Sequence, residues 1–207
     1  MNPHRRMLLA AAALAPLLAR AENDYTTLRD PLPVENPRKI EIAEFFWYGC
    51  IHCFHFEPLI EPWAAKLPPD AYFRRIPAVF SPRWGHDAAI FYTFEALGVL
   101  PKVHRAFFDA IHRDGLRTDN PQALDQWLGR QGIDPKRFAE TMKSFGVQTK
   151  LRRAAQLTAA SQIDGTPALM VQGLYTISAE QGRGLEGMLQ IADGLIPIVR
   201  KGLEARK

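Results

Sequence analysis

The chain of 207 residues contains only two cysteines, Cys50 and Cys53, and they stand where a strand pattern gives way to a helical one. Residues 39–48 predict a buried strand, and residues 50–67 predict a helix. A cysteine at a helix N-terminus lies near unpaired backbone N–H groups and the positive end of the helix dipole, which both stabilise a thiolate. Thiolates attack and leave in disulfide exchange, so the spacing predicts a redox-active pair. Cys50 is the expected exposed nucleophile, and Cys53 is its expected buried resolving partner.

The residues around the pair leave two other uses open. His52 lies between the cysteines and offers a hydrogen-bond donor and, when protonated, a positive charge. With His55 it could supplement the cysteines in a zinc site, although structural zinc takes four ligands and His52 sits inside the short ligand loop. A purely structural disulfide is the other alternative, but a cross-link over a two-residue gap stabilises a fold weakly. Redox chemistry is the favoured interpretation.

Residues 1–21 have the pattern of a cleavable secretory signal peptide. Arg5 and Arg6 precede an apolar run over residues 7–18, and residues 19–21 (Ala-Arg-Ala) fit a cleavage site. The run is too short to span a bilayer, although a retained anchor stays an alternative. The paired arginines leave the general secretory and twin-arginine routes both open. We expect an exported, oxidising location, most simply a bacterial periplasm.

The positive charge of the sequence is concentrated in this leader. The chain has 26 Lys and Arg against 22 Asp and Glu, and three of the arginines but none of the acids lie in residues 1–21. Without the leader the net charge is close to neutral, which gives no basis for nucleic-acid binding. The remaining residues are enough for one domain with an insertion.

The rest of the chain divides into two sheet-forming parts with a helical block between them. After an extended lead-in, residues 38–80 predict strand, helix and strand. Residues 81–150 predict a helical insertion in which Asn120-Pro121 and Asp134-Pro135 start helices. Residues 151–207 predict a helix, a hairpin about the two-residue turn Gln172-Gly173, and a last helix interrupted near Pro197. The order predicts an α/β fold, a mixed sheet flanked by helices with an inserted all-helical subdomain.

Several polar residues in these elements are candidates for a role. Glu44 lies on the same strand face as apolar neighbours, where an acid is costly unless it is paired, hydrated or protonated. It is either a strand-edge carboxylate that reaches water or a partly buried acid that handles protons for Cys53. Arg74 and Arg75 could pair with an acid, but surface positions are the simpler interpretation. The insertion also contains three histidines without ligand spacing, which fit surface or packing roles: His86, His104 and His112.

The tripeptide Gly165-Thr166-Pro167 precedes the hairpin. A proline among the first residues of a strand cannot donate to the ladder, which indicates a special position such as a cis bond. This order of elements, with residues 50–53 (Cys-Ile-His-Cys), residues 44–46 (Glu-Phe-Phe) and the Thr-Pro hairpin, resembles the DsbA family of thioredoxin-fold disulfide oxidases. The resemblance covers essentially the whole chain after residue 21.

The resemblance implies a role for each matching residue. Cys50 matches the nucleophile, Cys53 the resolving cysteine and His52 the thiolate-stabilising residue. Glu44 matches the buried acid of the family. Two residues match the substrate-binding positions, the cis-proline facing the disulfide and the residue that offers backbone to a bound peptide: Pro167 and Thr166. The family usually has proline at the position of Ile51, so how oxidising the couple is stays open.

The resemblance also implies the biochemical function. A thiol:disulfide oxidoreductase of this kind donates its disulfide to newly exported, unfolded proteins with free cysteines. A membrane quinone-linked oxidase of the DsbB type reoxidises it, and no dissociable cofactor is needed. A periplasmic reductase or isomerase is the nearest alternative, followed by a metal-binding chaperone that uses Cys50, Cys53 and a nearby histidine.

Overall fold

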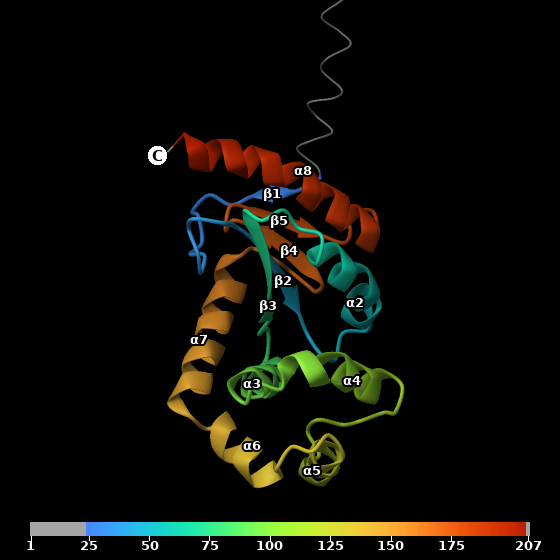
Figure 1. Ribbon diagram of the computed structural model, residues 1–207. Coiled ribbons are helices and arrows are strands. Elements are labelled where there is room, and N and C mark those ends of the chain that lie inside the picture. The colour runs from blue at the N-terminus through green and yellow to red at the C-terminus, as the bar shows by residue number, and fades with distance from the viewer. Residues whose placement is uncertain (1–23, 206–207) are drawn as a thin grey trace, which may run out of the picture.

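Residues 24–205, which the computed structural model describes, contain one mixed sheet of five strands in the order β1-β5-β4-β2-β3 (Figure 1). The predicted signal peptide lies outside the described residues. β2 is parallel to β3 and antiparallel to β4, and β5 is antiparallel to β4 and β1. The strand bounds are β1 (Thr26–Thr27), β2 (Ile40–Phe46), β3 (Ala71–Pro77), β4 (Ala168–Val171) and β5 (Tyr175–Ser178). The short strand β1 lies in the expected extended lead-in.

Helices cover both faces of this sheet. Ile40 and Ile42 of β2 face a core that includes α2 and α8, whereas Ala43 and Phe45 face a second core that includes α3, α4 and α7. All seven residues of β2 are buried, as expected of a central strand without clean polar alternation. The helix bounds are α2 (Ile51–Ala64), α3 (Pro82–Ala96), α4 (Leu100–His112), α5 (Pro121–Arg130), α6 (Pro135–Met142), α7 (Phe145–Ala160) and α8 (Leu185–Glu204).

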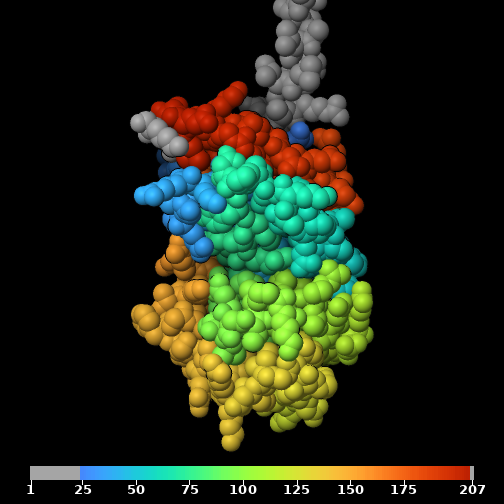
Figure 2. Space-filling view, in the orientation of Figure 1, coloured from blue at the N-terminus to red at the C-terminus, as the bar shows by residue number. Residues whose placement is uncertain are grey.

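The helical block lies at one end of the sheet. Figure 2 shows residues of α3 to α6, green to yellow, gathered below the sheet-forming parts of the chain. Two of its helices begin as predicted, because the side chain of Asn120 accepts from the N–H of Ala123 and that of Asp134 accepts from the N–H of Lys136. α7 continues across the expected boundary at residue 150 and joins the block to the sheet.

Three local predictions are wrong in detail. The hairpin loop has three residues, because Val171 pairs with Tyr175. The backbone N–H of Gln172 donates to the Glu41 carbonyl at 2.7 Å, and this contact with β2 sets the loop. α2 ends at Ala64 rather than near residue 67. α8 continues through Pro197, whose exposed position lets water satisfy the carbonyl that proline leaves free.

No helix within residues 24–205 is long and apolar enough to cross a membrane.

Candidate active site

Cys50 is the N-cap residue of α2, with extended backbone angles of −85° and 115°. Its sulfur accepts a hydrogen bond from the N–H of Cys53 at 3.4 Å, and its thiol lies 3.3 Å from the carbonyl oxygen of Thr166. The loop before it is closed by the N–H of Cys50, which donates to the Trp47 carbonyl at 2.9 Å. The sulfur is therefore held at the first turn of a helix and against the chain that precedes β4.

The two thiols have opposite acidities. The pKa of Cys50 is lowered to about 5, first by a hydrogen bond from the Cys53 side chain. The Thr166 hydroxyl and the N–H groups of Cys53 and His52 lower it further, although burial acts in the opposite direction. Burial, and after it the neighbouring Cys50, raises the pKa of Cys53 well above its ordinary value. Both cysteines are free thiols in this structure, Cys50 half-buried and Cys53 fully buried. This arrangement favours one exposed thiolate and one protonated thiol.

The peptide bond between Thr166 and Pro167 is cis, as the tripeptide suggested. Thr166 is separated from Cys50 by 116 positions in the sequence, and the fold brings its carbonyl to the sulfur. Its hydroxyl is buried and forms no hydrogen bond within residues 24–205 that meets the usual distance and angle limits. The hydroxyl nevertheless lies close enough to lower the pKa of Cys50. It is a donor that a thiolate can use.

The ring of His52 is exposed, and the described contacts include no hydrogen bond from it to the sulfur of Cys50. The backbone N–H of His52 does stabilise the thiolate. Two of the three histidines of the helical block contact backbone carbonyls. His86 and His112 bond backbone carbonyls of Thr118 and Tyr48, which fits the expected packing role.

Glu44 is fully buried in β2, so the strand-edge alternative is wrong. Neither of its oxygens has a hydrogen-bond partner within residues 24–205, and its closest charged neighbour is Arg75, whose Nε lies 3.4 Å away. Burial, and after it the negative charge of Glu57, raises the pKa of Glu44 to about 8. A carboxyl group in this position carries a proton at neutral pH.

Arg74 and Arg75 are not surface residues, which corrects the simpler interpretation of the second strand. The parallel register sets Arg75 beside Glu44, and its Nη2 donates to Glu57 Oε2 at 2.7 Å. Arg74 donates to the fully buried Glu41 at 2.9 Å. Both guanidinium groups are drawn inward because these carboxylates need a buried partner.

Glu57 and His104 are buried polar residues near the cysteines. Sequence reasoning missed Glu57 and gave His104 only a surface or packing role. Glu57 is buried one turn after Cys53 on α2, so an acid four positions from a buried cysteine was the available signal. His104 Nε2 lies 3.1 Å from Glu57, and His104 Nδ1 lies 2.8 Å from the Tyr48 hydroxyl. Within residues 24–205, no three Cys, His, Asp or Glu residues are grouped to hold a metal ion, so the set needed by a metal-binding chaperone is not assembled.

Apolar side chains surround the exposed side of Cys50. The Trp47 ring stacks on Trp84 with centroids 4.4 Å apart, and its indole N–H donates to Asp87 at 2.7 Å. A Cβ atom at Gly49 would clash with the Trp47 ring, so only glycine fits at this position. Ile51 is 44% exposed beside the sulfur. Trp47, Trp84 and Ile51 therefore leave apolar surface exposed to solvent near the start of α2.

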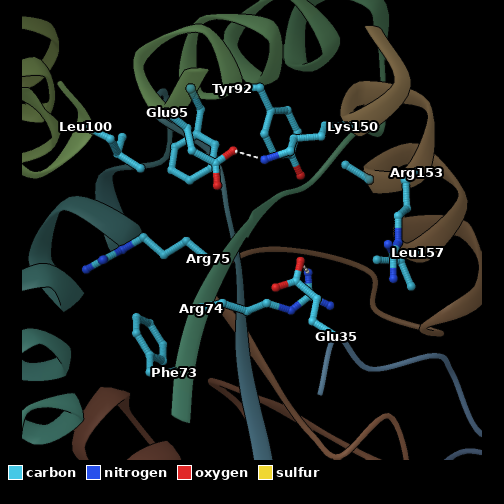
Figure 3. Close-up of a pocket in the computed structure, with 12 residues that line it drawn as sticks. Glu35, Phe73, Arg74, Arg75, Tyr92, Glu95, Leu100, Lys150, Arg153 and Leu157 are labelled. Carbon is cyan, nitrogen blue, oxygen red and sulfur yellow. Dashed lines mark hydrogen bonds and ion pairs between the residues drawn. The ribbon is translucent and has the colours of Figure 1, made fainter. Parts of the chain in front are cut away.

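A cavity of about 290 Å³ lies away from the cysteines, among β3, α3 and α7 (Figure 3). Four of the charged residues in its lining form two ion pairs, since Lys150 is 2.8 Å from Glu95 and Arg74 is 3.5 Å from Glu35. In Figure 3 the side chain of Arg75 points away from Lys150 and Arg153. Its guanidinium lies over the ring of Phe73 and pairs with Glu57. Neither cysteine is among the residues that line this cavity, so the cavity is separate from the Cys50–Cys53 site.

Comparison with known proteins agrees with this geometry. The family model of the DSBA-like thioredoxin domain matches residues 67–194, more than half of the chain. The thiol:disulfide interchange protein DsbA of Azotobacter vinelandii is 44% identical over 186 residues, which cover 90% of this chain and 87% of that protein. The crystal structure of Pseudomonas aeruginosa DsbA superposes with a TM-score of 0.82 at 39% identity, covering 89% of this chain and 95% of that one. DsbA from Xylella fastidiosa gives 0.80 at 32% identity, covering 86% and 96%. The chain belongs to the DsbA family of thioredoxin-fold thiol:disulfide oxidoreductases.

Proposed function

We propose that the protein donates a Cys50–Cys53 disulfide to newly exported proteins with free cysteines, in the periplasm. The opposed acidities of the two thiols carry this proposal. A strongly stabilised thiolate favours the reduced form, and a couple whose reduced form is stabilised is a strong oxidant. Membership of the DsbA family supports oxidation over reduction or isomerisation.

The reaction transfers two electrons from the substrate to the protein. A substrate thiolate attacks the Cys50 sulfur, a mixed disulfide forms, and the Cys50–Cys53 bond breaks. Cys53 leaves as a thiolate and takes a proton from Glu44, which its raised pKa keeps protonated at neutral pH. A second substrate thiolate attacks the substrate sulfur, and Cys50 leaves as a thiolate. Glu44 recovers its proton when Cys53 is reoxidised.

The remaining site residues bind and orient in this proposal. Thr166 and Pro167 present backbone to an extended peptide beside the sulfur, and the Thr166 hydroxyl donates to the Cys50 thiolate. His52 stabilises the same thiolate through its N–H and, when protonated, through its charge. The redox-active disulfide is itself the reacting group, so the cycle uses no dissociable cofactor.

The sequence and the family also support proposals for export and for regeneration of the disulfide. We propose that residues 1–21 act as the signal peptide. A DsbB-type membrane oxidase linked to quinone would restore the disulfide. These assignments agree with a couple that works as an oxidant, since an exported oxidant needs a continuing supply of oxidising equivalents.

The test is the equilibrium of the Cys50–Cys53 couple with a glutathione series, read by mass-tagging of free thiols. We expect a potential clearly more oxidising than thioredoxin, whose value is about −270 mV. A potential at or below thioredoxin's would contradict the oxidase and make the protein a reductase. Ile51→Pro gives the contribution of the altered dipeptide in the same assay.

A further inference from the structure

One guanidinium serves two buried carboxyl groups beneath the cysteine pair. Arg75 donates two hydrogen bonds to Glu57, at 3.1 Å and 2.7 Å, and its closest approach to Glu44 is an ion-pair distance of 3.4 Å. Glu44 accepts no hydrogen bond from any group within residues 24–205. Two neighbouring carboxylates in one dry site cannot both ionise without a large cost, so their surroundings decide which one carries the charge.

His104 gives Glu57 a third hydrogen-bond donor, besides the two from Arg75. Its Nε2 lies 3.1 Å from Glu57 Oε1, and its Nδ1 lies 2.8 Å from the Tyr48 hydroxyl oxygen. A carboxylate can only accept, so Nε2 carries the proton, and Nδ1 accepts from the hydroxyl of Tyr48. The neutral imidazole with its proton on Nε2 satisfies all three groups at once. The ring is almost fully buried, which also favours this neutral form.

We propose that His104 is a positioning residue for the proton step at Cys53. Its N–H holds Glu57 as the carboxylate, and Glu57 in turn engages the charge of Arg75. Glu44, left without a donor, stays the group that holds a proton beneath the cysteines. The inference rests on the proposed role of Glu44.

The acidities of the two carboxyl groups agree with this division. Although burial opposes ionisation, the His104 hydrogen bond and the charge of Arg75 hold the pKa of Glu57 below its ordinary value. The pKa of Glu44 is raised by burial and next by Glu57.

Other charged groups face Glu44 from the elements packed around it. Besides Glu57 and Arg75, these are Cys50, Cys53 and Glu61, all from α2 or its start. Arg105 lies on α4 beside His104. Glu61 and Arg105 reach solvent, which screens their effect, and neither contacts Glu44. The His104 N–H therefore adds to the two hydrogen bonds from Arg75 in distinguishing Glu57 from Glu44.

The test compares His104→Phe with His104→Gln in carboxyl ¹³C NMR of glutamate-labelled protein, assigned with Glu44→Gln and Glu57→Gln. Phe fills the ring volume without a donor, whereas Gln keeps an N–H group. We expect H104F to raise the pKa of Glu57 and to lower that of Glu44 by about one unit, the scale of one charge-assisted hydrogen bond. H104Q should keep the wild-type titration. His86→Phe is the matched control, because His86 bonds only a backbone carbonyl in the described residues.

The same variants are compared in the pH dependence of reoxidation by oxidised glutathione. With H104F the midpoint assigned to Glu44 should move down by about one pH unit. An H104F protein with the wild-type Glu44 titration and rate profile overturns the proposal. If H104F does not fold, imidazole ¹⁵N NMR of the wild-type protein decides: His104 should be neutral at neutral pH, with its proton on Nε2. A proton on Nδ1, or titration near the usual pKa, overturns it. If E44Q leaves the reoxidation rates unchanged, Glu44 has no role in the proton step. The carboxyl titrations of H104F would then still test whether His104 sets the pKa values of Glu57 and Glu44.

Discussion

At the scale of single residues, the site depends on making two chemically identical side chains different. Cys50 is surrounded by donors at the first turn of a helix, whereas Cys53 is sealed from water one turn later. Neither the N-terminus of α2 nor burial alone gives this contrast. Hydrogen bonds from the Cys53 side chain, the Thr166 hydroxyl and the N–H groups of the first turn lower the pKa of Cys50. Burial raises the pKa of Cys53, because the chain crosses from surface to interior within three residues.

Thr166 gives a direct test of one of these donors. Replacing Thr166 by Val keeps the shape of the side chain but removes the hydroxyl that stabilises the Cys50 thiolate. We expect the pKa of Cys50 to rise by up to about one unit, and the couple to become more reducing by up to about 30 mV. The thiolate absorbance in the ultraviolet, followed against pH, measures the shift.

Thr166→Ser is the matched control, because it keeps the hydroxyl, and its titration should stay near that of the wild type. If Val and Ser titrate alike, the hydroxyl does not reach the sulfur and the donors of α2 act alone.

At the scale of elements, the parallel pairing of β2 and β3 sets a cation beside an acid. Glu44 and Arg75 are register partners, and α2 adds Glu57 from above. The central sheet tolerates these groups because the charge of Arg75 is balanced by Glu57, while Glu44 carries a proton.

This arrangement predicts a strong dependence of stability on both partners. Arg75→Leu leaves Glu57 without its main partner, and we expect the free energy of unfolding to fall by about 3 kcal/mol. Glu57→Leu alone should also destabilise, because it strips Arg75 of its hydrogen bonds. The double variant should lose clearly less than the sum of the two, because no unpaired charge then stays buried. Urea unfolding of the four proteins measures the coupling, and additive losses would contradict the pairing.

The sequence predicts those features of the elements that depend on neighbouring residues. The caps at Asn120 and Asp134, the buried strand β2 and the placement of Cys50 can all be read from short windows. The inward turn of Arg75 and the part played by His104 cannot, because they depend on which face of α2 and α4 meets the sheet.

The contact between Thr166 and Cys50 could not be predicted from local sequence patterns. Thr166 lies far along the chain from Cys50, and no periodicity connects them. Family resemblance predicted that they meet at the site, since the resemblance contains the fold. Two local predictions failed because the surroundings override local rules. A contact with β2 sets the length of the hairpin loop, and solvent exposure lets α8 continue through Pro197.

At the scale of the whole molecule, an oxidant of this kind should be more stable when it is reduced. The disulfide form has no thiols to ionise, so the Cys50 thiolate contributes only to the reduced protein. A thermodynamic cycle equates this extra stability with oxidising power, because folding and reduction are linked.

The acidities of the two thiols fix the pH window of this difference. A pKa held below its unfolded value stabilises the folded protein above that value, about 8.5 for cysteine, and the effect is lost as the pH falls through about 5. Above about pH 8.5 the raised pKa of Cys53 acts in the opposite direction, since the unfolded chain can ionise there and the folded one cannot. The raised pKa of Glu44 belongs to both redox forms and largely cancels in the comparison.

We therefore expect the free energy of unfolding of the reduced protein, minus that of the oxidised protein, to grow as the pH rises from about 5 to 8. With solvent screening of the half-buried sulfur taken into account, the gain between about pH 5 and 7 should be about 2 kcal/mol. Urea unfolding of both redox forms at a series of pH values measures it. The variant Cys50→Ala, which has no such thiolate, should lack the gain when compared with Cys50→Ala/Cys53→Ala. A difference that stays constant over this range would mean that the Cys50 thiolate is no better held in the folded protein than in the unfolded chain, and the source proposed here for the oxidising power would be wrong.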